Sequence, residues 1–172
     1  MKTHLFLVLL LCRFSGFGQS SWSPVAPVNS QLLPHFSTSI DSIVYSNESL
    51  KGKVVYINFW YAACPPCMAE FDALNDLYKK IKDKKNLVFL SMTFEPSDVI
   101  AMLVEKFKIR YPILSFPDAE LKKLNFGKGF PTSLVIDAEG KVVYVRTGGS
   151  SDKKEARKLI MKEIYPAILK NL

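Results

Sequence analysis

VVYINFWYAACPPCMAEF, residues 54–71, decides the fold because it joins a buried strand to a helix through a pair of cysteines. Residues 54–60 are β-branched and aromatic with hardly a polar break, which is typical of a central parallel strand covered on both faces. Cys64 and Cys67 follow this predicted strand. After them, apolar residues recur at the helical spacing of three and four: Met68, Phe71, Leu74, Leu77, Tyr78 and Ile81. The Cys-Pro-Pro-Cys motif is therefore expected to open a helix.

The place of this motif at a helix start predicts redox chemistry. The first N–H groups of a helix are unpaired and the helix dipole adds partial positive charge, so a thiolate at Cys64 is favoured over the thiol. Pro65 and Pro66 suit the first turn because proline has no N–H to donate and its φ is already helical. We expect the Cys64 sulfur to face solvent and attack a target disulfide. Cys67, tucked under the helix, would then resolve the mixed disulfide.

Two other roles for the cysteine pair are possible. A zinc site needs four ligands, but the remaining cysteine is Cys12, near the N-terminus, and the two histidines are His4 and His35. We therefore expect no metal and no organic cofactor. A purely structural disulfide between Cys64 and Cys67 is the second alternative, but so short a loop constrains the unfolded chain little. The pattern favours a reversible, redox-active disulfide.

Two stretches of the chain resemble a known family. NFWYAACPPC at residues 58–67 and GFPTSLVID at residues 129–137 are similar to the thioredoxin superfamily, and within it to the exported TlpA/ResA-like thiol–disulfide oxidoreductases. The resemblance extends over residues 36–167. It implies a thioredoxin-like α/β fold, in which a central mixed sheet is flanked by helices.

The same resemblance assigns residues around the cysteine pair. It implies that Pro131 is the family's cis-proline, which faces the pair, and that Phe130 beside it presents its backbone to substrate. Ala63 departs from the family, which usually carries Trp directly before the first cysteine. Trp60 and Tyr61 are therefore expected to form the local aromatic surface that contacts substrate.

The N-terminus has the features of a signal peptide over residues 1–18, namely a charged head, a short apolar run and small residues before residue 19. The apolar run is much shorter than the roughly 20 residues that span a bilayer, so we expect cleavage after Gly18 and export to the periplasm or cell envelope. Lipidation at Cys12 is an alternative, but bulky Leu11 precedes it where a small residue is needed. Removing the leader leaves the motif's cysteines as a single pair, which again points to a working disulfide.

Beyond the leader we predict an extended tail at residues 19–35 and one thioredoxin-like domain at residues 36–172. Asp118 is expected to cap a short helix, and Pro166 to kink or end the last helix. A βα excursion over residues 111–125, before the proline, is where the family differs from plain thioredoxin. The predicted elements are one or two edge strands within 36–50, strand 54–60, a helix from the motif to 81, strand 87–92, helix 96–109, strand 111–115, helix 118–125, an antiparallel hairpin of 133–136 and 141–145, and helix 152–169.

Polar residues near the pair suggest where a proton could go. Asn58 stands where plain thioredoxins carry a buried acid beneath the second cysteine, so an acceptor for the Cys67 proton must come from elsewhere. Glu70, one helical turn after Cys67, matches the family acid implicated in redox tuning and is the first candidate. An equally open alternative is a solvent-facing Glu70 that merely suits the helix dipole. Glu95, in the loop after the second strand, is the second candidate.

We interpret the chain as an exported enzyme, a thiol–disulfide oxidoreductase that acts on protein thiols and disulfides. The resemblance favours reduction, as in cytochrome c maturation, with a membrane-bound electron donor; a monomer is expected. The formal net charge of +7 falls to +5 without Lys2 and Arg13 and is ascribed mostly to solubility, with an acidic partner or an anionic membrane surface as the lesser alternative; nucleic acid is not an expected partner. A thiol peroxidase would carry Thr where this chain has Tyr61, and a copper carrier would need a His after His35. A non-enzymatic role in an envelope assembly stays open.

Overall fold

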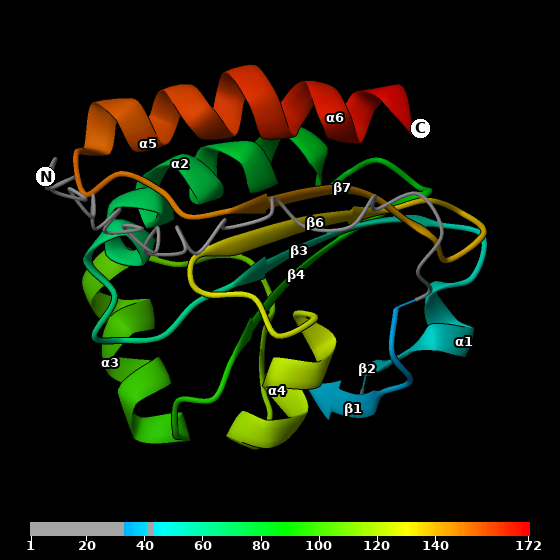
Figure 1. The fold of residues 1–172 in the computed structure, drawn as a ribbon, viewed down its shortest axis with the longest axis horizontal. Helices are drawn as coiled ribbons and strands as arrows, with labels where there is room; N and C mark the ends of the chain where they lie inside the picture. Colours follow the sequence, from blue (N-terminus) through cyan, green and yellow to red (C-terminus); the bar gives the residue numbers. More distant parts are fainter. Residues whose placement is uncertain (1–32, 41–42) are drawn as a thin grey trace, which may run out of the picture.

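A five-stranded mixed sheet forms the centre of the computed structural model, which describes residues 33–40 and 43–172 (Figure 1). The strand order is β5-β4-β3-β6-β7. β3 pairs in parallel with β4, and β4 with β5, whereas β6 runs antiparallel to both β3 and β7. β3 is the middle strand and all its residues are buried, as its apolar sequence predicted. The strands are β3 (Val54–Phe59), β4 (Leu87–Thr93), β5 (Ile113–Ser115), β6 (Thr132–Ile136) and β7 (Val142–Thr147).

Helices cover both faces of this sheet, and Figure 1 shows α2 and α5 on one face and α4 on the other. One hydrophobic cluster joins the sheet to α2, α3 and α5 through residues such as Phe71, Leu103 and Leu159. A second cluster, which includes Leu121 and Leu124, lies between the sheet and α4. The thioredoxin-like arrangement expected from the sequence is therefore present. The helix bounds are α2 (Pro65–Ile81), α3 (Ser97–Phe107), α4 (Asp118–Leu124), α5 (Lys153–Leu159) and α6 (Tyr165–Lys170).

The N-terminal strands differ from the prediction. β1 (Ser37–Ile40) and β2 (Ile43–Ser46) pair with each other in a separate two-stranded sheet and are not edge strands of the central one. A short helix, α1 (Asn47–Leu50), follows because Ser46 forms a reciprocal capping box with Ser49. The predicted signal peptide, the lipidation alternative at Cys12 and most of the predicted tail lie outside the described residues.

Two helix predictions are also corrected. Pro117, not Asp118, is the N-cap of α4; Asp118 lies in the first turn and forms an ion pair with Lys122 at 2.7 Å. Of the two effects predicted for Pro166, a kink or an end of the last helix, the end is wrong, because the helical segment continues to Lys170. A π-helical turn, η1 (Ile160–Ile164), directly precedes it, and such a wider turn accommodates a proline that lacks an N–H. None of the helices in the described part of the chain is both long and apolar enough to cross a membrane.

Candidate active site

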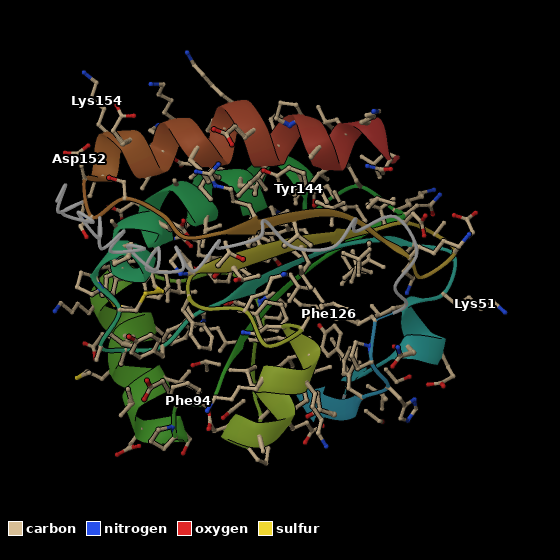
Figure 2. All side chains as sticks on the ribbon, viewed as in Figure 1. Lys51, Phe94, Phe126, Tyr144, Asp152 and Lys154 are labelled. Atoms are coloured by element: carbon tan, nitrogen blue, oxygen red, sulfur yellow. A yellow bond between two sulfur atoms is a disulfide. The ribbon has the colours of Figure 1, made fainter. Side chains whose placement is uncertain are left out.

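The two cysteines form a disulfide at the N-terminal end of α2, seen as the yellow bond in Figure 2. Cys64 is the N-cap residue, its Cα lies 5.2 Å from that of Cys67, and the prolines between them occupy the first turn. The backbone N–H of Cys67 donates to the Cys64 sulfur at 3.2 Å. A negative charge on this sulfur would thus be stabilised by a hydrogen bond and by the helix dipole.

Both sulfur-bearing residues are buried, which corrects the expectation that Cys64 faces solvent. Cys64 is 3% exposed and Cys67 is 1% exposed. The reason is that the disulfide belongs to the same hydrophobic cluster as Phe71, while partly buried Tyr61 and Phe130 pack against it. A substrate disulfide must therefore pass the side chains of Tyr61 and Phe130, which form the rim around the cysteine pair, before the Cys64 sulfur can attack it.

Trp60 is not part of that rim, so the expectation that it contributes to the aromatic surface is wrong. Its side chain is fully buried, and its ring meets that of Phe71 edge-on with centroids 5.1 Å apart. The indole N–H donates to the hydroxyl of Ser91 on β4 at 2.8 Å. This bond explains how an indole can be buried at a strand end without an unsatisfied donor.

Tyr61 and Phe130 do form an aromatic surface, together with Phe94. The Tyr61 and Phe94 rings are stacked with centroids 5.8 Å apart, and Phe130 meets Tyr61 edge-on at 5.3 Å. Figure 2 labels Phe94 between the α3 and α4 ribbons. Phe94 was missed from the sequence, although one signal was available. It directly follows β4, so it lies at the same sheet edge as the loop after the parallel strand β3.

The Phe130–Pro131 peptide bond is cis, the isomer expected from the sequence. Gly149, after β7, packs closely against this loop. A Cβ atom on Gly149 would stand 3.0 Å from Cγ of Pro131 and 3.6 Å from Cβ of Pro66. The loop of Phe130 and Pro131 and the segment of residues 61–67, which we call the cysteine loop, therefore meet at Gly149, although they are far apart in sequence.

Glu70 is buried beside the same contact, so the alternative of a solvent-facing Glu70 is wrong. It is 2% exposed, and its Oε1 would lie 2.8 Å from a Cβ on Gly149. Burial raises the pKa of the Glu70 carboxyl to about 8, while the hydrogen bond with Asn58 and the charge of Arg146 act in the opposite direction. The Asn58 amide donates to Glu70 Oε2 at 3.5 Å. Glu70 thus holds a proton at neutral pH next to the cysteine loop.

Glu95, the second candidate acid, binds the backbone of the segment that leads into the cysteine motif. Its carboxylate accepts the backbone N–H of Ala62 at 2.6 Å, and its own N–H donates to the Thr93 hydroxyl at 3.2 Å. Glu95 therefore ties the loop after β4 to the residues that lead into the cysteine motif. Within residues 33–40 and 43–172, no group of three or more His, Cys, Asp or Glu side chains is placed to hold a metal ion.

Comparisons with known proteins agree with this geometry. The Redoxin family matches residues 27–160. The thiol-disulfide oxidoreductase ResA of Bacillus anthracis is 33% identical over 122 residues, which cover 69% of this chain and 68% of the relative. ResA of Bacillus thuringiensis subsp. konkukian is 26% identical over 168 residues, 95% of each chain. A crystal structure of a thiol:disulfide interchange protein from Chlorobium tepidum TLS, 26% identical, covers 80% of this chain and 97% of its own with a TM-score of 0.59.

Proposed function

Since this chain belongs to the Redoxin family and is a thiol-disulfide oxidoreductase, we propose that it reduces disulfides of exported proteins through its cysteine pair. The observation that carries the proposal is the Cys64–Cys67 disulfide at a helix start, with the Cys67 N–H directed at the Cys64 sulfur. Such a bond is readily broken and remade, because the helix end stabilises the thiolate that leaves or attacks.

In the reduced enzyme, the Cys64 thiolate attacks one sulfur of a substrate disulfide and releases the other as a thiolate. A mixed disulfide between Cys64 and the substrate results. Cys67 then loses its proton and attacks the Cys64 sulfur, which releases the second substrate thiolate and restores the Cys64–Cys67 disulfide. Two electrons pass from enzyme to substrate. The aromatic surface of Tyr61, Phe94 and Phe130 would contact the substrate chain around its disulfide.

Glu70 suits the proton transfer in this reaction. Burial raises the pKa of the Glu70 carboxyl to about 8, so near neutral pH this group can both accept and return a proton. Glu70 lies one helical turn from Cys67, and both are buried. In its carboxylate form it would accept the Cys67 proton, and in its acid form it would return one to a departing thiolate.

The cellular setting that we propose rests on the sequence. The leader predicted over residues 1–18 would place the enzyme in the periplasm or cell envelope. There it would act as a monomer without a metal or organic cofactor, take electrons from a membrane-bound donor, and serve cytochrome c maturation or a similar process.

The order of attack is tested with single-cysteine variants. Cys64→Ser should abolish reduction of insulin disulfides, whereas Cys67→Ser should accumulate a mixed disulfide on Cys64, measured by mass spectrometry under non-reducing conditions. Equal trapping by both variants would contradict the assigned order. Full activity of Cys64→Ser would refute the function itself.

A further inference from the structure

Two adjoining depressions, which we together call the basic trench, lie between the cysteine loop and the outer side of α2. Its first part, of about 490 Å³, is lined by the cysteine loop, the end of α3 and the start of α5. Its second part, of about 590 Å³, lies along the outer side of α2. The two parts share Lys106, Phe107 and Lys153, so they form one surface. Figure 2 labels Asp152 and Lys154 at the start of α5, at the same end of the molecule as the disulfide.

The part of the trench next to the disulfide is apolar. Ala63 and Pro65, the residues on either side of Cys64, line it together with Met68 and Phe107. An extended chain lying in the trench would therefore pass over Ala63 and Pro65, the neighbours of Cys64, and bury apolar surface there.

The outer part of the trench carries excess positive charge. Both of its acids form ion pairs with cations of α5. Asp72 pairs with Lys153 at 2.8 Å, and Asp76 pairs with Arg157. The lining cations Lys79, Lys106, Lys108 and Arg110 form no ion pair within the described part of the chain. Lys106 instead lies over the Phe107 ring, 5.4 Å from its centroid.

The backbone of the segment that carries Lys106, Lys108 and Arg110 is tied to α2. The Asn75 amide on α2 donates to the Phe107 carbonyl at 3.2 Å, and its oxygen accepts the Arg110 N–H at 3.1 Å. The segment that carries the cations is thus fixed to the trench floor. Lys108 ends α3 with a φ of +52°, a conformation that favours glycine. Glycine would adopt this backbone conformation at a lower energetic cost, but the chain has a lysine here, which adds a positive charge to the trench.

From this surface we infer that the basic trench docks an acidic segment of the protein whose disulfide is reduced. The inference rests on the proposed function and adds a choice of substrate to it. Apolar residues near the substrate's cysteines would lie against Met68 and Phe107, and Glu or Asp residues further along would meet Lys106, Lys108 and Arg110.

The test uses synthetic peptides that share one disulfide and differ in a flanking run of Glu, Gln or Lys. Reduction by the full-length reduced enzyme is followed at low salt and at about 1 M salt, where the screening length is about 3 Å. We expect kcat/KM for the Glu peptide to exceed that for the Gln peptide by about three- to tenfold at low salt, the range for a few exposed charge pairs. The Lys peptide should be the poorest substrate, and salt should remove the differences.

Variants assign this preference to the trench. Lys106→Gln with Arg110→Gln should abolish the preference for the Glu peptide, whereas Lys123→Gln with Lys141→Gln, an equal change of charge at exposed positions outside the trench, should retain it. Lys108→Gly is a second test that should keep the fold, because glycine readily adopts the positive φ at this position. This variant should also weaken the preference for the Glu peptide.

The outcomes separate the two proposals. Equal rates for all three peptides, or a preference that the trench variants retain, would overturn the docking inference and leave the reductase in place. Failure to reduce both the peptides and insulin would overturn the proposed function, and the docking inference with it.

Discussion

Glu70→Gln should make the oxidised protein more stable at alkaline pH and change its stability little in acid. A glutamate that is 2% exposed has almost no water to solvate its charge when it ionises in the folded protein, whereas its carboxylate is fully hydrated in the unfolded chain. Gln has nearly the same shape and cannot ionise. It can also donate to the buried Oδ1 of Asn58, which has no hydrogen-bond partner in the described part of the chain.

The sign and size follow from the two pKa values of Glu70, about 8 in the folded protein against an ordinary 4.5. Below about pH 4.5 both states hold the proton and nothing is lost. Between about pH 4.5 and 8 the unfolded chain releases the proton that the folded protein keeps, so stability falls with rising pH. At about 1.4 kcal/mol per pKa unit, the loss between about pH 5 and pH 8.5 comes to about 4 kcal/mol, which Glu70→Gln removes.

The assay is urea unfolding of both proteins at about pH 5 and pH 8.5, with the disulfide kept oxidised so that neither Cys64 nor Cys67 titrates. Glu139→Gln, at an exposed turn between β6 and β7, is the matched control for loss of one carboxylate and should behave like the parent. If the free-energy difference between Glu70→Gln and the parent is the same at both pH values, the buried acid does not titrate as argued, and its role in proton transfer falls too.

Two further variants test the packing of the site. Gly149→Ala should destabilise the protein by about 1–3 kcal/mol and alter the thiol titration of the reduced form, because its Cβ would stand 2.8 Å from Glu70 Oε1; Gly129→Ala, whose Cβ meets nothing closer than 3.9 Å, should do neither. Trp60→Phe should lower the unfolding free energy by about 1–3 kcal/mol because it leaves the buried Ser91 hydroxyl without its indole partner. An unchanged unfolding curve with a raised KM would contradict the buried packing role of Trp60 and indicate that it contacts substrate.

Much of the fold could be predicted because hydrophobic pattern and helix-start chemistry are local. Residues 54–71 contain the central strand, the turn and the helix start, and the structure has all of them. Features set by neighbours distant in sequence were harder to see. Whether the strands before residue 50 join the central sheet depends on pairing, and the π-helical turn that accommodates Pro166 has no local sequence mark.

The site shows the same division. Cys64 and Cys67 stand out by spacing, but the burial of Glu70 could not be decided from its place on the helix, because Gly149, which lies after β7, packs against its carboxyl. Trp60 was misplaced for a similar reason, since the hydroxyl that receives its N–H is on the neighbouring strand β4.

Helix α2 presents the two properties that matter for the reaction on different sides. Its buried side carries Cys67 and Glu70, which decide how readily protons and electrons move. Its outer side carries Asn75, which binds the backbone of the segment that bears cations of the basic trench. Buried carboxyl chemistry acts on the thiols after the substrate has arrived, whereas exposed charge acts on encounter and choice of partner. A change on one side should therefore leave the other property intact, so that a chain with this fold can alter its substrates by surface substitutions while its redox chemistry stays the same.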